Sequence, residues 1–273
     1  MVASVTTRKS YMLGTTPPTV SQNILIPTRE SVNTILNSGY KVIDWSNPIT
    51  LGLKAVFDVP NAIEVITGNR ANTNTSTRGV SLKGAVGSFA STANQRYTSH
   101  PNFAITGDLS IVVYCDVNAL SNYGALIAKQ ATTTTNAPYE LRLGVASTDS
   151  VLSLLRANAS AFGSRTGSFS NTVTAGQKNW CAVLSVSGQD AKGPCWWSNG
   201  GTGSFSGTGA GTVTDNGSDV WIGRRFDGAT QLDGKIYYIA LYNRLLSEPE
   251  GRSIINNPAQ IFKGTSTNIW VPA

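Results

Sequence analysis

LSIVVYCDV, residues 109–117, carries the clearest strand pattern in the chain. Apolar side chains at every second position, from Leu109 to Val117, would lie together on one face of a β-strand. Similar short runs recur from about residue 46, separated by turns rich in Gly, Asn and Thr. The other predicted strands are 51–58, 62–67, 79–90, 123–129, 139–145, 151–156, 180–186, 194–198, 220–223 and 235–242. Because no helical pattern separates consecutive strands, the sequence predicts an all-β fold, a two-sheet antiparallel jelly-roll sandwich.

The composition agrees with this fold class. Only 13% of the 273 residues are charged, whereas the chain contains 29 Ser, 30 Thr and 22 Asn. Hydrophobic residues make up 40% of the chain, which is enough to build a core. Five Glu cannot supply the salt-bridged faces of helical bundles or coiled coils. Short strands joined by many turns suit such a composition better.

The charge pattern excludes some partners. The net charge is +6, but the basic residues are scattered, and only Arg8-Lys9 and Arg224-Arg225 are adjacent. Nucleic-acid sites usually show clustered Lys and Arg, so no nucleic-acid partner is expected. No apolar run approaches the roughly 18 residues that a membrane span needs, so no membrane insertion is expected. The three cysteines (Cys115, Cys181, Cys195) lack metal-ligand spacing and are predicted to be small core residues.

Residues 1–45 differ from the rest of the chain. They are rich in Thr, Ser and Pro, with apolar residues only in short bursts such as Ile24-Leu25-Ile26. A short helix is plausible at residues 28–37, with Thr28 as its N-cap. Such a segment cannot build its own core, so we expect an extended arm that orders against sister subunits or another partner. The predicted domains are therefore an N-terminal arm, 1–45, and a β-sandwich, 46–273.

Two stretches are predicted to be loops, and one segment is predicted to be a helix. The loops are 131–137, with four consecutive Thr, and the Gly-rich stretch 198–218. The helix is expected near the C-terminus, where Ser247-Glu248-Pro249-Glu250 forms a capping box. It should continue through Ile254 and Ile255, which would pack on the sandwich, and stop near Pro258.

Several motifs resemble a known family. Val220-Trp221-Ile222-Gly223, and the block from Leu232 to Glu248 that includes Tyr242-Asn243-Arg244-Leu245-Leu246-Ser247, look like the final strands of laminin-G-like, concanavalin-A-like jelly-roll domains. The ending 255–262, INNPAQIF, is similar to the termini of such modules in tailed-bacteriophage gene products. The resemblance covers about two-thirds of the chain, from residue 79 to residue 262. It implies the sandwich fold and a phage origin, and it implies function only weakly, because this fold hosts many functions.

Catalytic groups are scarce. Glycan hydrolysis needs two carboxylates that flank one sugar bond, and the five Glu form no such pair on a strand. Glu248 and Glu250 lie two residues apart, but helix capping explains them. His100, the single histidine, lies in a turn-like stretch, and no serine elbow occurs. The protein is therefore predicted not to be an enzyme.

No cofactor and no metal site are predicted, although calcium stays open as an alternative. Four Asp fall within a short region and could supply the oxygen ligands that calcium prefers: Asp215, Asp219, Asp227 and Asp233. The dense Asp spacing of a calcium loop is absent, however, and Asp in Gly-rich turns commonly bonds to its own backbone.

Sugar binding is chemically plausible, because aromatic rings stack on sugars while amide, carboxylate and guanidinium groups bind hydroxyls. The candidate glycan-binding residues are Trp196, Trp197, Trp221, Arg224 and Asp227. Trp196 and Trp197 should point to opposite faces of a strand, so at most one of them should face the core. The other could bind a ligand, cap a loop or lie in a subunit interface.

These patterns predict a non-enzymatic structural component of a tailed-phage virion, assembled in the host cytoplasm. A capsid decoration or head-appendage protein, anchored by its N-terminal arm and carrying a lectin-like sandwich, is the first expectation. The alternative is a glycan-binding, receptor-recognition module of a tail fibre or a secreted adhesin. The expected partners are other virion proteins, sister subunits and, in the alternative, host surface glycans.

Overall fold

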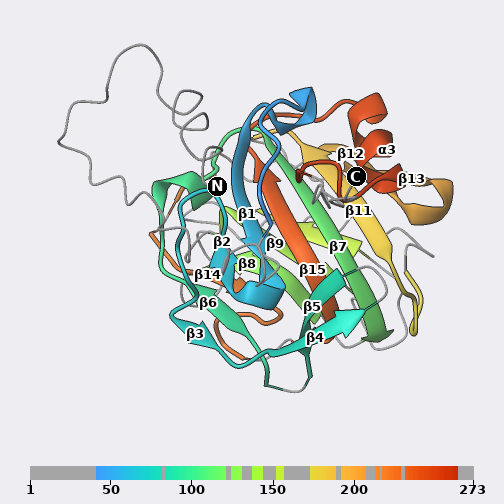
Figure 1. Cartoon of the computed structure of the whole chain (residues 1–273). Helices are drawn as coiled ribbons and strands as arrows, with labels where there is room; N and C mark the ends of the chain where they lie inside the picture. The colour runs from blue at the N-terminus through green and yellow to red at the C-terminus, as the bar shows by residue number, and fades with distance from the viewer. Residues whose placement is uncertain are drawn as a thin grey trace, which may run out of the picture. The chain divides into compact units, whose positions relative to one another are not determined.

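The structure, a computed structural model, describes residues 41–81, 84–90, 92–120, 124–130, 137–143, 152–156, 173–188, 192–206, 213–215, 217–228 and 231–263. The predicted helix at 28–37 and most of the predicted loop at 131–137 lie outside these residues. In the described part, the strands form two antiparallel sheets, and one α-helix, α3 (Glu248–Asn256), follows the last strand (Figure 1). The prediction of an all-β, two-sheet sandwich with a short C-terminal helix is confirmed.

The first sheet is built around the stretch with the clearest strand pattern, which becomes β7. Its strand order is β13-β12-β11-β7-β15-β1-β2, and a hairpin of β4 and β5 joins it through β15. Its strands are β1 (Leu53–Asp58), β2 (Ile63–Glu64), β4 (Thr77–Ser81), β5 (Gly84–Phe89), β7 (Leu109–Ala119), β11 (Trp180–Val186), β12 (Lys192–Trp197), β13 (Gly201–Ser206) and β15 (Asp233–Tyr242).

The second sheet lies against one face of the first and has the strand order β10-β9-β8-β14-β6-β3. Its strands are β3 (Thr73–Asn74), β6 (Gln95–Tyr97), β8 (Gly124–Lys129), β9 (Tyr139–Leu143), β10 (Leu152–Leu155) and β14 (Val220–Ile222). Short 3-10 turns complete the described chain: η1 (Pro48–Thr50), η2 (Val59–Asn61), η3 (Pro101–Phe103) and η4 (Ser198–Gly200).

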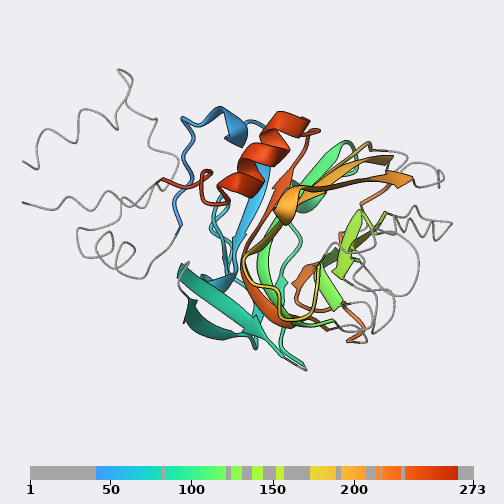
Figure 2. The same cartoon turned by 90° about the vertical axis from the view of Figure 1, so that its right-hand side faces the viewer.

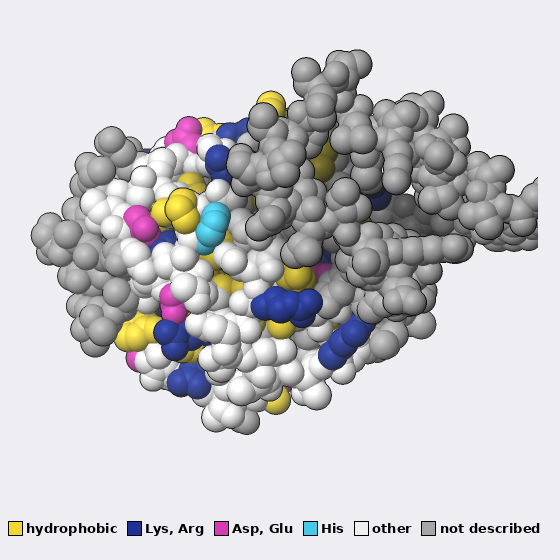
Figure 3. Space-filling view, turned by 60° about the vertical axis from the view of Figure 1, so that its left-hand side comes forward, with side chains coloured by type: hydrophobic (Ala, Val, Ile, Leu, Met, Phe, Trp, Pro, Cys, Tyr) yellow, Lys and Arg dark blue, Asp and Glu magenta, His cyan; other side chains and the backbone are white. Residues whose placement is uncertain are grey.

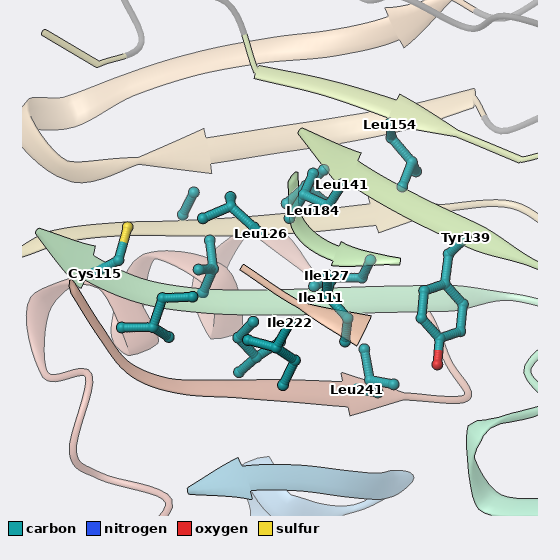
Figure 4. Packing of buried hydrophobic residues seen from close by; sticks show 14 of the residues in the cluster. Ile111, Cys115, Leu126, Ile127, Tyr139, Leu141, Leu154, Leu184, Ile222 and Leu241 are labelled. Atoms are coloured by element: carbon teal, nitrogen blue, oxygen red, sulfur yellow. The ribbon is translucent and has the colours of Figure 1, made fainter. Parts of the chain in front are cut away.

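The main core lies between the two sheets. The alternating residues of β7, from Leu109 to Val117, all enter it, as the sequence pattern predicts. In Figure 4, Ile111, Leu184 and Leu241 of the first sheet lie close to side chains of the second sheet, such as Leu141 and Ile222. All five residues are fully buried, so the hydrophobic effect stabilises the packing of the two sheets.

A second core lies on the outer face of the first sheet, under α3. Figure 2 shows the resulting three layers: helix, first sheet and second sheet. Ile254 of α3 is fully buried in this core and Ile255 packs at its edge, as predicted. The helix lies close to the sheet at Gly251: a Cβ atom added there would be only 2.5 Å from Cε3 of Trp196.

The predicted capping box starts α3. The backbone N–H of Ser247 donates to Oε2 of Glu250 at 2.8 Å. The Arg244 guanidinium also donates to Glu250, at 2.6 and 3.1 Å. Hydrogen bonds from Arg244 are the largest cause that lowers the pKa of Glu250, to about 2. The charged carboxylate therefore stabilises the start of the helix at neutral pH.

Some strands differ from the prediction. The single strand expected at 79–90 is the β4–β5 hairpin, in which Ser81 pairs with Gly84. Part of the Gly-rich stretch expected to be a loop is strand β13, which pairs with β12 along its whole length. The short strands β3 and β6 were not predicted. Among the described residues, no helix is long and apolar enough to cross a membrane.

The two ends of the described chain meet. Ile43 forms an antiparallel bridge with Phe262, and Lys41 donates to Asp58 at 2.5 Å. Ile43 is only 3% exposed and belongs to the second core. Residues 41–45 thus contact the sandwich, whereas the rest of the predicted arm lies outside the described part.

Candidate functional site

Two of the predicted glycan-binding residues are buried. Trp196 is 3% exposed and lies in the second core, and Trp197 is 9% exposed and lies in the core between the sheets. They do point to opposite faces of β12, as expected. The expectation that at most one would face the core differs from the structure, because α3 covers the outer face and creates a second core there. Neither ring presents an open face to solvent.

Trp221 is placed differently. It lies at the centre of β14, between Val220 and Ile222, which both point into the core. Its side chain therefore points to the outer face of the second sheet, where it is partly exposed. The Arg96 guanidinium lies 5.2 Å from the centre of its ring, a cation–π distance. Nε of Arg96 donates to Oδ2 of Asp219 at 2.6 Å, and Oδ1 of Asp219 accepts a hydrogen bond from the backbone N–H of Ser99.

The strand register puts Trp221 in a row with three other residues. Trp221 pairs directly with Arg96 on one side and with Ala128 on the other, and Ala128 pairs with Glu140. Side chains of directly paired residues lie on the same face of a sheet. At about 4.8 Å between strands, the row spans about 14 Å across the outer face. We call these four residues the outer row.

A charged cluster lies at one end of the outer row. Leu141 points into the core, so its neighbour Glu140 lies on the outer face of the sheet. Glu140 nevertheless has no exposed surface. The Arg142 guanidinium donates to both its oxygens, at 2.5 and 2.8 Å, and Arg225 lies 3.8 Å away. Arg225 is in turn paired with Asp227 at 2.5 Å. These side chains form a network in which two slightly exposed arginines enclose a fully buried carboxylate.

Of the remaining candidates, Asp227 belongs to this cluster through Arg225, whereas Arg224 makes no hydrogen bond or ion pair with a residue of the outer row among the described residues. Arg224 lies just beyond β14, where its backbone bridges to Gln231 and its Nε is buried without a hydrogen-bond partner. The structure thus brings Trp221 and Asp227 to one face and separates them from Trp196 and Trp197.

Sequence reasoning missed Arg96, Glu140, Arg142 and Arg225 as candidates. One signal was present: in the strand Tyr139–Leu143, Glu140 and Arg142 alternate with leucines and so were expected on the opposite face. Which other strands contribute to that face depends on the sheet order, which the sequence does not reveal.

The four aspartates considered for calcium are engaged separately. Each has its own partner: Asp215 pairs with Lys129 at 2.8 Å, Asp219 with Arg96, Asp227 with Arg225, and Asp233 with Asn118 at 3.1 Å. Within the described ranges, no group of three or more His, Cys, Asp or Glu is arranged to hold a metal ion.

The groups considered for catalysis serve local structure. His100 caps η3, where its Nδ1 accepts the backbone N–H of Asn102 at 3.1 Å. Glu248 and Glu250 lie at the start of α3, as expected. The three cysteines are free and buried, and burial raises the pKa of each thiol. This confirms that they are core residues.

One side of the described surface carries little concentrated charge. Figure 3 shows one side of the molecule, where the described surface is mostly uncharged and Lys and Arg side chains occur in small separate groups. This distribution agrees with the scattered basic residues of the sequence.

Comparisons by sequence find no relative: no family model and no curated protein matches the chain. Solved structures, in contrast, share its fold. Domain 4 of AbnA, a GH43 extracellular arabinanase from Geobacillus stearothermophilus in complex with arabinotriose, matches with a TM-score of 0.55 and 14% identity. That match covers 74% of this chain and 98% of the other.

Two further structures are similar. Trypanosoma rangeli sialidase in complex with sialic acid matches with a TM-score of 0.55 and 17% identity over 79% of this chain and 34% of the other. The binding domain of Paraclostridial Mosquitocidal Protein 1 matches with a TM-score of 0.53 and 12% identity, over 76% and 52%. This chain thus spans about a third of the sialidase and half of the mosquitocidal domain. At such identities the likeness shows the β-sandwich fold.

Proposed function

We propose that this chain is a non-catalytic carbohydrate-binding module and that its ligand site is the outer row of the second sheet. The observation that carries the proposal is the position of Trp221, a partly exposed indole between Arg96 and Ala128 on directly paired strands. Aromatic rings provide stacking surfaces for sugars, and fixed polar groups beside them give orientation.

The charged cluster supports this proposal. Glu140, Arg142 and Arg225 are held by one another at one end of the outer row, so their hydrogen-bonding groups are already positioned. Preorganised groups lose little entropy when a ligand binds. Domain 4 of the arabinanase, whose structure is a complex with arabinotriose, and the mosquitocidal binding domain share this fold, and they support the proposal by analogy.

A binding role is favoured over an enzymatic one. On the outer row, the described carboxylates are each paired with an arginine: Glu140 with Arg142 and Arg225, and Asp219 with Arg96. Glycoside hydrolysis needs one carboxyl group that gives up a proton and a second that acts as base or nucleophile. Both oxygens of Glu140 accept from Arg142, and the two oxygens of Asp219 accept from Arg96 and from the backbone N–H of Ser99, so these carboxylates already serve as acceptors within the protein.

Substitution of Trp221 tests the proposal. Wild-type protein should bind a subset of oligosaccharides on a glycan array that includes arabinotriose and bacterial surface glycans. Trp221→Ala should weaken that binding about tenfold, because the stacking surface is lost. Isothermal titration calorimetry measures the loss, and thermal unfolding checks that the variant is folded.

Trp45→Ala is the matched control. Trp45 is 58% exposed and precedes η1, on the side of the first sheet that faces away from the second sheet. This variant should bind like wild type. Absence of binding to any glycan, or equal affinity of wild type and Trp221→Ala, would contradict the proposal.

The sequence resemblance supports a second proposal, about where the module works. The ending INNPAQIF and the strand motifs before it are similar to tailed-phage gene products, and we place the module on a virion, anchored by residues 1–45. Its partners there are other virion proteins and sister subunits. Mass spectrometry of purified particles should detect the protein, and removal of residues 1–40, which spares the contacts of Lys41 and Ile43 with the sandwich, should leave a folded sandwich that no longer joins particles. Normal incorporation of the truncated protein would exclude this anchoring role.

A further inference from the structure

Gln130 has a buried side chain whose hydrogen-bonding capacity is unused. The residue is 1% exposed, and neither Oε1 nor Nε2 has a hydrogen-bond partner in the structure. Its neighbour Lys129 is also buried, but Lys129 Nζ has three partners: Asp215, Ser99 and the carbonyl of Ser218. The contrast is notable because buried polar groups in proteins are nearly always paired.

The strand register places Gln130 beside the outer row. Lys129 pairs with Val220 and Tyr139, which both point into the core between the sheets. Side chains alternate along a strand, so Ala128, next to Lys129, points to the outer face; β8 ends at Lys129, and the same alternation carried one residue further puts Gln130 on that face as well. Gln130 therefore follows Ala128 on the same face, next to the strand that carries Trp221.

An unpaired buried carboxamide destabilises the folded protein, because its water contacts are lost without replacement. A residue of this kind persists where it serves a binding role or where an ordered water satisfies it. A primary amide has one acceptor oxygen and one donor nitrogen a short distance apart. Two neighbouring hydroxyls of a sugar ring match that pair, since one can accept from Nε2 while the other donates to Oε1.

The charged groups of the outer row and its cluster are paired with one another. Arg96 is held by Asp219, and Glu140 is held by Arg142 and Arg225, the second of which also pairs with Asp227. Counted together, the three arginines and the three carboxylates carry no net charge. Such a surface offers hydrogen bonds without an excess positive charge that would attract an acidic sugar.

We infer that Gln130 determines the specificity of this face by binding two neighbouring hydroxyls of a neutral sugar. The inference rests on the proposed function and names its ligand class: neutral glycans rather than sialylated or uronate-bearing ones. A ligand reaches the carboxamide by displacing a neighbouring side chain.

Gln130→Leu tests the inference, since leucine has a similar volume and no hydrogen-bonding group. The array should carry each neutral oligosaccharide beside a counterpart with an added sialic acid or uronate. Wild type should prefer the neutral members, and the tightest of them should bind Gln130→Leu about tenfold or more weakly, because two hydrogen bonds are lost. The midpoint of thermal unfolding should stay the same or rise, because an unpaired buried amide has been removed.

Gln260→Leu is the control. Gln260 also has a buried, unpartnered Nε2, but it lies beyond α3, on the side of the first sheet that faces away from the second. Its substitution should leave glycan affinity unchanged.

Three outcomes overturn the inference. If Gln130→Leu binds glycans as wild type does, an ordered water satisfies the amide. If its unfolding midpoint falls while affinity is unchanged, Gln130 is structural. If acidic members bind more tightly, the ligand class is wrong. In all three cases Trp221-dependent binding persists, so the proposed function survives, whereas absence of any glycan binding overturns both.

Discussion

Glu140 is a fully buried carboxylate on the outer face of a sheet, and two arginines enclose it. A buried charge is tolerated only when partners compensate for the lost hydration. Arg142 and Arg225 provide that compensation from two different segments, the strand β9 itself and the chain after β14. A single residue thus connects neighbouring parts of the second sheet.

Glu140→Gln should lower the free energy of unfolding by about 3 kcal/mol, because both arginines lose the charge that compensates them in a buried site. Urea denaturation followed by tryptophan fluorescence measures the loss. Glu248→Gln is the control: the Glu248 side chain is 64% exposed and pairs with Arg252 at 3.4 Å, so its loss should cost about 0.5 kcal/mol. Equal losses for both variants would show that Glu140 is not effectively buried.

At this scale, the sequence predicts the direction of a side chain better than its burial. Alternation with Leu141 correctly places Glu140 opposite the core. Its burial depends on Arg225, which lies far away in the sequence and reaches Glu140 only after β14 pairs with β8. The same holds for Trp196. Alternation along the strand predicts the face of the sheet on which its ring lies, but it does not predict that α3 covers the ring.

The helix α3 is the element whose attachment depends most clearly on one position. Gly251 is buried in the helix against the ring of Trp196, and an added Cβ would lie 2.5 and 2.9 Å from ring atoms. A methyl group at this site fits only if the helix or the indole moves.

Gly251→Ala should therefore lower stability by about 1 kcal/mol, because overpacking exceeds the gain in helix propensity that alanine brings. Thermal unfolding measures the shift. Gly107→Ala is the control, because nothing lies within 4 Å of the position where its Cβ would be and its φ is not in the left-handed region. A stability gain for Gly251→Ala would mean that the helix packs less closely than described.

Elements with a hydrophobic alternation were predictable, and those without it were not. The strand Trp180–Val186 occurs at its predicted bounds, and the helix starts at its predicted cap. Strand β13 was predicted as loop because glycines and short polar residues dominate it. Its strand structure comes from pairing with β12, a long-range interaction that local composition does not report.

At the scale of the whole molecule, Arg156 joins segments that are distant in the sequence. It is 1% exposed, and its guanidinium donates to four backbone carbonyls: Pro138 at 2.8 Å, Gly107 at 2.9 Å, Ser187 at 3.3 Å and Ile105 at 2.8 Å. Those carbonyls precede β7, precede β9 and follow β11, so one side chain connects the two sheets.

Arg156→Met should lower the free energy of unfolding by at least about 3 kcal/mol, since it leaves several buried carbonyls without a donor. Chemical denaturation measures this change. The control is Arg70→Met, at an exposed position whose side chain makes no hydrogen bond or ion pair with the described residues, where the change should lie within about 0.5 kcal/mol. A small effect of Arg156→Met would indicate that water replaces the guanidinium.

The sandwich as a whole was predictable because strand density and the absence of helical spacing leave few alternatives. The order of strands was not. The outer row comes from β6, β14, β8 and β9, and this combination follows only from long-range pairing. For this reason the sequence indicated Trp221 but not the residues beside it.

The bridge between Ile43 and Phe262 has a consequence for orientation. Both ends of the described chain leave the sandwich at neighbouring points on the side of the first sheet that carries α3 (Figure 2). The outer row lies on the opposite side, on the second sheet. An attachment made at these two ends of the described chain would therefore lie on the side of the sandwich opposite to Trp221.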